Sequence, residues 1–200
     1  MDIDVWASTE EVRVLVKECM AKCKPMVIIE LGTFTGVGTQ TIANFVSTYS
    51  DKQANLYTFD GLSEVVYQDV GIDKFSYRLK GPTVDLWPEV IAKRNARISQ
   101  EYPNCQITFI EGIIRDTLPR AMLEIGEWDF CFHDSTHSPH LQLEDFRAME
   151  PWSHIGSMIL FDDADQGFMV FFLEQVNNWT AENVSVENRV TGLLVAERVA

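Results

Sequence analysis

MVIIELGTFTGVG, residues 26–38, joins a continuous apolar run to a glycine-rich segment. A run such as MVIIEL is typical of a strand that is buried on both faces of a parallel sheet. The glycines that follow let the backbone turn tightly and approach a ligand closely. The helix expected over 39–50 would present free N–H groups behind that turn. The stretch therefore predicts a strand, a ligand-binding turn and a helix in succession.

The rest of the chain repeats this alternation. Further strands are expected over 55–60, 106–112, 128–134 and 157–163, and further helices over 8–23, 86–101, 118–126, 138–150 and 168–179. Two β-rich runs within 184–199 are consistent with a final hairpin. Alternating strands and helices favour an α/β fold, with a mainly parallel sheet and helices on both faces. Ligands bind such sheets outside the carboxyl ends of the strands, near the switch point of strand order.

The length of 200 residues is that of one domain, spanning 1–200. Its N-terminal helix is expected within 1–24. The segment 61–85 has no clean period and carries several aromatic residues. Long loops at this edge of a sheet are often lids, so the segment is a candidate lid or substrate loop. A small packed excursion explains the same pattern equally well.

Charge and cysteine usage restrict the partners and the compartment. The 16 basic and 30 acidic residues give a net charge of −14, which argues against nucleic acid and anionic membranes as partners. No apolar run approaches the roughly 20 residues of a membrane span, and the N-terminus lacks a signal-peptide core. The four cysteines show no zinc-site spacing, so reduced thiols in a cytoplasmic protein are the simplest interpretation.

Acidic residues fall at or near the expected ends of four strands: Asp60, Glu111, Asp134, Asp162 and Asp163. Because those ends share one edge of the sheet, we expect a ligand there. Asp60 follows the second strand, where an acid can accept hydrogen bonds from both ribose hydroxyls of a nucleoside-containing cofactor. Glu30 would repel a pyrophosphate, but it could accept a hydrogen bond from the amino group of a cofactor's amino-acid tail.

A second group of residues suggests a metal site. Neighbouring strands lie about 4.8 Å apart, so Asp134, Asp162 and Asp163 can converge, and a hard cation such as Mg²⁺ would offset their repulsion. Adjacent strand residues point to opposite faces, so Asp162 and Asp163 both bind only if the chain is already turning there. Otherwise one of them hydrogen-bonds the loop backbone.

His137 follows Asp134 by three residues, at the start of the next helix. It is a candidate general base for a hydroxyl held at the metal. A solvated surface histidine and a metal ligand are the alternative interpretations. Asp145, in the helix that follows, is expected on the exposed helix surface.

Two motifs carry a resemblance to a known family. Glu30, Gly32 and Gly36 form the pattern E-x-G-x-x-x-G, which resembles the first motif of class I S-adenosylmethionine (SAM) methyltransferases. The D-x-x-H of 134–137, followed by the D-D of 162–163, resembles metal-dependent O-methyltransferases of the macrocin and cephalosporin-tailoring type, the methyltransferase-24-like group. Catechol and caffeoyl-CoA O-methyltransferases are similar at a greater distance. The resemblance covers about residues 26–198.

The resemblance implies a Rossmann-like class I methyltransferase fold, a seven-stranded sheet that ends in an antiparallel hairpin. It implies Asp134, Asp162 and Asp163 as ligands of Mg²⁺ or another divalent cation, and His137 as the base. The cofactor-binding residues it implies are Glu30, Gly32, Thr33, Gly36, Asp60, Gly61, Gly112, Ile113, Arg115 and Asp134. The substrate it implies is a small hydroxylated molecule: a sugar, a natural product or a phenol.

Three other functions compete with this interpretation. A nicotinamide-dependent oxidoreductase is disfavoured because the glycine spacing G-x-x-x-G-x-G differs from the dinucleotide fingerprint G-x-G-x-x-G. A non-catalytic SAM-binding domain would not need the acids and histidine of the second site. A metal-independent methyltransferase would use the same carboxylates to bind substrate. The sequence leaves open whether copies of the chain form a homo-oligomer.

Overall fold

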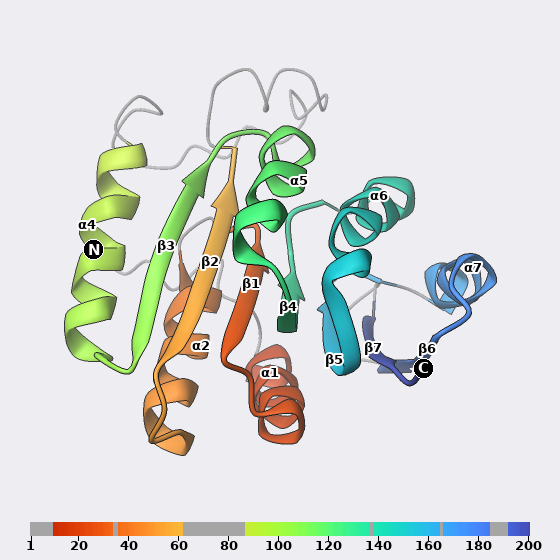
Figure 1. Ribbon diagram of the computed structural model, residues 1–200, viewed down its shortest axis with the longest axis horizontal. Coiled ribbons are helices and arrows are strands. Elements are labelled where there is room, and N and C mark those ends of the chain that lie inside the picture. The colour runs from red at the N-terminus through yellow and green to blue at the C-terminus, as the bar shows by residue number, and fades with distance from the viewer. Residues whose placement is uncertain (1–9, 34–35, 62–86, 137, 165, 185–191) are drawn as a thin grey trace.

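The computed structural model describes residues 10–33, 36–61, 87–136, 138–164, 166–184 and 192–200, and shows a seven-stranded sheet between two layers of helices (Figure 1). The first half of the chain contributes α1 (Glu10–Cys23), β1 (Val27–Leu31), α2 (Val37–Tyr49), β2 (Ala54–Asp60), α4 (Trp87–Glu101) and β3 (Cys105–Glu111). The second half contributes α5 (Ile114–Ile125), β4 (Trp128–His133), α6 (Pro139–Met149), the short 3₁₀ helix η4 (Glu150–Trp152), β5 (Ser153–Phe161), α7 (Gln166–Gln175), β6 (Trp179–Val184) and β7 (Leu193–Arg198).

The strands are arranged in the order β3-β2-β1-β4-β5-β7-β6. The first five are parallel, and β7 runs antiparallel to both β5 and β6. The chain runs outward from β1 to β3 on one side and then returns to place β4 on the other side of β1. The order therefore reverses between β1 and β4, which is where sheets of this kind bind ligands.

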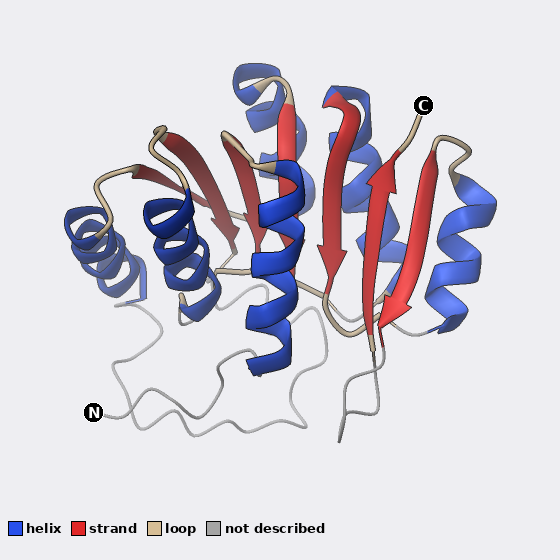
Figure 2. Ribbon diagram, turned by 90° about the horizontal axis from the view of Figure 1, so that it is seen from below, coloured by secondary structure: helices blue, strands red, loops and turns tan. Residues whose placement is uncertain are grey.

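Each face of the sheet is covered by its own helices (Figure 2). Helices α1, α2 and α4 pack on one face, and α5, α6 and α7 pack on the other. Successive residues of β1 serve the two faces in turn, since Ile28 packs with the first group and Ile29 with the second. Both faces of β1 are thus buried, which explains the uninterrupted apolar run of its sequence.

The predicted α/β fold is confirmed, including the mainly parallel seven-stranded sheet and its final antiparallel pair. Several boundaries differ; β5 begins at Ser153 rather than 157, and the final pair begins with β6 at Trp179 rather than at 184. Helix α5 begins at Ile114 rather than 118. Helix α7 ends at Gln175, and Trp179 opens β6 instead of closing a helix that was expected to reach 179. Trp179 is buried against the rings of Phe146 and Trp128, so a tertiary aromatic contact sets this boundary.

The expected lid and the expected N-terminal helix include residues outside the described ranges. The candidate lid 61–85 falls on 62–86, except for Gly61, and part of the N-terminal helix region falls on 1–9. Within the described residues, no helix combines the length and apolar character required to cross a membrane.

Candidate functional site

The glycine loop after β1 is attached to the end of β2. The backbone N–H groups of Gly32 and Thr33 both donate to the carbonyl oxygen of Phe59, at 2.9 and 3.2 Å. The hydroxyl of Thr33 also hydrogen-bonds that of Thr58. Gly32 has a φ of 96°, and a Cβ there would lie 2.6 Å from the carbonyl carbon of Asp134. A side chain at Gly32 would therefore collide with the backbone at the end of β4.

Glu30 is fully buried beneath the start of α2. Its Oε2 accepts a hydrogen bond from the Thr39 hydroxyl at 2.6 Å, and its Oε1 has no hydrogen-bond partner among the described residues. Burial raises the pKa of Glu30 to about 7, although the nearby hydroxyls of Thr39 and Thr58 and the charge of Arg94 oppose this shift. A buried carboxylate with an oxygen left over is suited to receive a hydrogen-bond donor from a ligand.

The ends of β2 and β3 are joined in the same way. The N–H of Gly112 donates to the carbonyl oxygen of Asp60 at 3.0 Å. Ile113 is the N-cap residue of α5, and Arg115 is exposed in the first turn of that helix. Asp60 and Gly61 are half-buried at the end of β2. The sequence-predicted cofactor residues of these two loops thus lie along one edge, next to the glycine loop.

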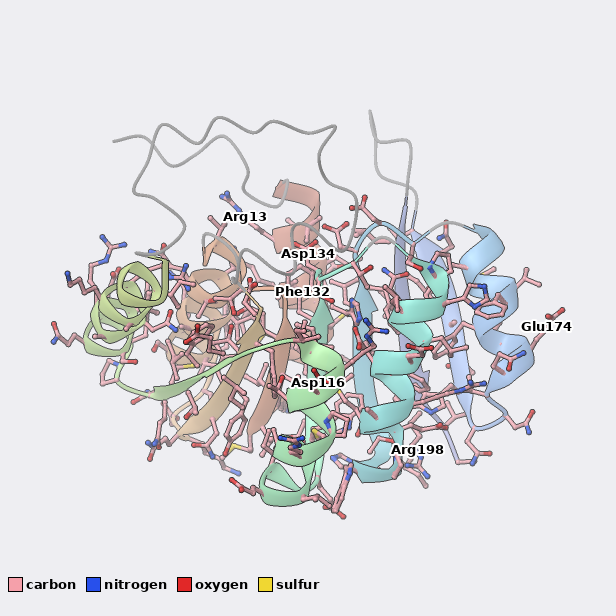
Figure 3. All side chains as sticks on the ribbon, turned by 90° about the horizontal axis from the view of Figure 1, so that it is seen from above. Arg13, Asp116, Phe132, Asp134, Glu174 and Arg198 are labelled. Atoms are coloured by element: carbon pink, nitrogen blue, oxygen red, sulfur yellow. The ribbon has the colours of Figure 1, made fainter. Side chains whose placement is uncertain are left out.

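Asp134 and Asp162 continue the parallel pairing of β4 and β5. His133 pairs with Phe161 at the strand ends, and the N–H of Asp162 then donates to the His133 carbonyl oxygen at 2.9 Å. The N–H of Asp134 donates to the Leu31 carbonyl oxygen at 2.8 Å, which ties it to β1 as well. Figure 3 looks onto this edge and labels Asp134 near its middle. Asp134 and Asp162 are therefore at neighbouring positions beside the switch point.

The chain turns at Asp163, which has a φ of 53°. Asp162 is buried, and its Oδ1 accepts a hydrogen bond from the Asp163 N–H at 2.8 Å. The turn removes the strand alternation that would otherwise separate these two side chains. The carboxylate of Asp162 bonds the backbone of this turn through Oδ1.

The fit of this edge to a divalent cation is partial. Two carboxylate residues at neighbouring strand ends supply the oxygen ligands that Mg²⁺ prefers, and Mg²⁺ is usually held by one or two carboxylates with water or substrate oxygens completing the shell. Among the described residues, however, no group of three or more His, Cys, Asp or Glu side chains is arranged to hold a metal. His137, the predicted base, lies outside the described residues. The metal ligands and the base remain predictions.

The expectation that Asp145 is exposed is wrong. Asp145 of α6 is buried, and its Oδ2 lies 3.1 Å from Nε2 of His133, which is also buried. His133 stands one residue before Asp134 and packs against the ring of Phe161. This buried pair connects α6 to the end of β4, and it was missed because the partner of Asp145 is distant in sequence.

Arg94 of α4 is a second residue at the site that the sequence did not single out. A Cβ on Gly36 would lie 2.5 Å from Nη1 of Arg94, so the guanidinium rests directly on the glycine loop. Its Nη2 donates to Oδ1 of Asn95 at 3.0 Å. Nothing in the spacing of helix 87–101 marks Arg94 among the other basic residues there.

The strand order, the glycine loop after β1 and the final antiparallel pair define the class I methyltransferase fold. Residues 29–164 match the family Methyltransf_24, a methyltransferase domain, and the chain belongs to this family. The match begins in β1 and ends beyond Asp163, so it includes the glycine loop and the acids of β4 and β5. The protein is therefore a methyltransferase, as the sequence motifs predicted.

Solved structures share this fold. The O-methyltransferase TomG from Streptomyces achromogenes, involved in tomaymycin synthesis and solved with SAM, superposes with a TM-score of 0.67 at 17% identity over 100% of this chain and 84% of TomG. The calicheamicin methyltransferase CalS11 gives 0.64 at 17% identity over 94% and 79% of the two chains. An O-methyltransferase from Bacillus cereus, solved with S-adenosylhomocysteine (SAH), gives 0.64 at 14% over 98% and 84%. A search of curated proteins gave no match.

Proposed function

We propose that the protein transfers the methyl group of SAM to a hydroxyl oxygen of a small molecule, with a divalent cation at the edge formed by β4 and β5. The observation that carries the proposal is the juxtaposition, at the switch point, of the glycine loop with its buried Glu30 and the paired positions Asp134 and Asp162. The first can hold a cofactor, and the second can orient a polar substrate next to it.

The cofactor would lie across the ends of β1, β2 and β3. Glu30 offers an oxygen to the ammonium of the methionine moiety, and the backbone of Gly32, Thr33 and Gly36 allows close approach. Asp60 would accept hydrogen bonds from the ribose hydroxyls. Gly61, Gly112, Ile113 and Arg115 would border the adenine. The SAM and SAH bound to TomG and to the Bacillus cereus enzyme support this choice of cofactor.

The metal would be held by Asp134 and Asp162, with Asp163 as the third predicted ligand. A divalent cation here would supply Lewis-acid activation and orientation of a substrate oxygen. His137 would accept the hydroxyl proton. The lone pair of the substrate oxygen then forms a bond to the methyl carbon as the carbon–sulfur bond breaks. The electron pair of the broken bond stays on sulfur, which gives SAH. Because the sulfonium releases a neutral thioether, SAH, which is a good leaving group, positioning and deprotonation are the main tasks of the chain.

A small molecule is favoured as acceptor over nucleic acid. The fold alone does not decide this, because an rRNA methylase from Streptococcus thermophilus superposes with a TM-score of 0.55 at 14% identity, over 93% of this chain and 95% of that enzyme. The net charge of −14 favours a small molecule, since RNA binding draws on clustered cationic side chains that neutralise phosphates. The O-methyltransferases TomG and CalS11 act in the synthesis of small molecules, which agrees with this choice.

The first test is ligand binding followed by transfer. Calorimetry should show that the protein binds SAH and not NAD. Incubation with isotope-labelled SAM and a panel of sugars, phenols and hydroxylated natural products should give a labelled O-methyl product, read by mass spectrometry. Binding of NAD without SAH would exclude the proposal in favour of an oxidoreductase. Binding of SAH with no transfer to any nucleophile would favour a non-catalytic SAM-binding domain.

The second test addresses the metal. Excess EDTA should abolish transfer, and Mg²⁺ should restore it. Asp134→Asn and Asp162→Asn should lower kcat by about a hundredfold or more. Asp51→Asn serves as the matched control, because Asp51 is exposed ahead of β2 at the opposite edge. Full activity in EDTA would be compatible with the proposed methyl transfer but would contradict the proposed metal. The carboxylates would then bind substrate directly.

A further inference from the structure

Arg94 reaches the glycine loop from α4, an element between β2 and β3 that the family motifs do not include. The guanidinium lies against Gly36, and Asn95, which is buried, accepts hydrogen bonds from Nε at 3.3 Å and from Nη2 at 3.0 Å. Gly36 has a φ of 81° and is the N-cap residue of α2. A cation is thus held at the turn where the cofactor is expected to approach most closely.

The electrostatic setting of Arg94 is defined by two acids of the same site. Burial lowers the pKa of Arg94, while the charges of Glu30 and Asp60 act in the opposite direction. The guanidinium remains charged, because an arginine in a protein is not deprotonated near neutral pH. The loop edge therefore combines two acidic groups with one fixed cation that contacts the loop itself.

That combination matches the charges of the amino-acid tail of SAM. The tail carries an ammonium, which can donate a hydrogen bond to Glu30. It also carries an α-carboxylate, which Glu30 and Asp60 would both repel. A carboxylate brought to a partly buried site needs a cationic or N–H donor partner. We propose that Arg94 binds the α-carboxylate of SAM and makes the site selective for the complete amino-acid tail, an inference that rests on the proposed cofactor site.

The test compares two ligands that differ in this one group, SAM and decarboxylated SAM. The wild-type chain should bind SAM more tightly, by about tenfold to a hundredfold, the usual effect of a charge-assisted hydrogen bond. Arg94→Met should remove this preference by weakening SAM while leaving decarboxylated SAM nearly unchanged. Arg94→Lys should keep part of it, since a lysine retains the charge without the planar fork. Arg97→Met, on the exposed side of the same helix, should behave as wild type.

Other results would overturn either the role of Arg94 or the proposed function. An Arg94→Met chain that folds, by circular dichroism, and keeps the wild-type preference would overturn the inference. Tighter binding of SAM by Arg94→Met would also overturn it, because Arg94 would then compete with the cofactor for the loop. If the wild-type chain binds neither ligand, the proposed function itself fails, which separates the two claims. If Arg94→Met does not fold, the preference of Arg94→Lys for SAM over decarboxylated SAM is measured instead. A preference equal to that of the wild type would contradict the role of Arg94 in binding the carboxylate.

Discussion

At the scale of single residues, Glu30 shows how a carboxylate can be prepared for a cationic ligand. Burial between the sheet and α2 disfavours its ionised form and raises its pKa to about 7. Thr39 satisfies one oxygen, and the other has no partner among the described residues. A ligand ammonium at that oxygen would favour the ionised form and lower the pKa again.

The raised pKa of Glu30 predicts a pH-dependent stability. The folded chain holds this proton more tightly than an unfolded chain, in which the pKa would be near the ordinary value of 4.5. The contribution is therefore complete below about pH 4.5 and disappears as the pH rises through about 7. The free energy of unfolding of the unliganded wild type, relative to Glu30→Gln, should fall by about 2 to 3 kcal/mol between pH 5 and pH 8. Urea unfolding at each pH measures it.

Subtracting the Glu30→Gln curve cancels the titration of the other carboxylates, which both proteins share. A flat difference across this range would show that Glu30 ionises at an ordinary pKa. With saturating SAM the same difference should become smaller, because the ligand offsets the cost of the buried charge.

Gly32 gives a second residue-scale prediction. Gly32→Ala combines an unfavourable φ of 96° with a collision against the Asp134 carbonyl, whereas Gly126→Ala has a φ of 76° and open space around it. We expect Gly126→Ala to cost about 2 to 3 kcal/mol of unfolding free energy, because its φ of 76° and ψ of −139° suit only glycine. Gly32→Ala should cost clearly more, because the collision adds to the backbone strain; urea unfolding measures both. Equal losses at the two sites would mean that the contact between the glycine loop and β4 adds nothing.

The site residues that sequence reasoning proposed are those whose pattern is local. Glu30, Gly32 and Gly36 stand in one loop with a recognisable spacing, and strand ends can be read from apolar runs. Arg94 could not be found in this way, because its contact with Gly36 depends on how α4 packs beside α2 on one face of the sheet. Asp145 failed for the same reason, since a polar residue in a helix reads as exposed unless its partner is known.

At the scale of elements, the pair His133–Asp145 connects β4 to α6 just below the acidic edge. The Nδ1 atom of His133 has no hydrogen-bond partner among the described residues. The imidazole is therefore held through Nε2, which pairs with the Asp145 carboxylate of α6. Gln142 of the same helix donates to the Asp162 carbonyl oxygen at 3.0 Å. Helix α6 thus contacts both strands that carry the predicted metal ligands.

Removal of Asp145 should loosen this connection. Asp145→Ala leaves a buried imidazole nitrogen without its partner, and we expect a loss of about 2 to 3 kcal/mol of unfolding free energy by chemical denaturation. Glu144→Ala, at the neighbouring exposed position, should change stability by less than about 0.5 kcal/mol. A similar, small effect of both substitutions would contradict a structural role for the pair.

Element boundaries were predictable where a turn separates two elements in the sequence. They were not predictable where two consecutive elements lie in one continuous apolar segment. The segment 168–179 is apolar enough to suggest a single helix, yet α7 stops at Gln175 and β6 starts at Trp179. The burial of Trp179 among the rings of Phe146, Phe172 and Trp128 decides the change of structure. Such a cluster forms only once α6, α7 and β4 are assembled.

At the scale of the whole molecule, strand order is what converts scattered acids into a site. The sequence predicted parallel strands with a common edge, but periodicity does not state which strands are neighbours. The structure places β1 between β2 and β4, so that the glycine loop lies between Asp60 on one side and Asp134 on the other. The order of the described strands thus brings together residues that are more than 70 positions apart in the chain.

The charge of the whole chain predicts its response to salt. A net charge of −14 destabilises the compact state by self-repulsion, and added ions screen this repulsion. The Tm should rise by a few degrees between about 20 and about 200 mM NaCl, measured by differential scanning fluorimetry. A metal site would add a further rise with MgCl₂ at equal ionic strength. A Tm that falls with NaCl would show that attractive ion pairs outweigh the repulsion.

The packing of Gly38 against Glu30 has a consequence for anyone redesigning the cofactor loop. A Cβ on Gly38 would overlap with Oε1 of Glu30 and come within 3.2 Å of the Phe132 ring, so each of the two positions limits the size of the other. A larger residue at 38 becomes acceptable only alongside a shorter acid at 30, and the effects of such a pair of changes are not the sum of the separate ones. Variant libraries that sample one position at a time would discard these combinations, whereas joint randomisation would recover them.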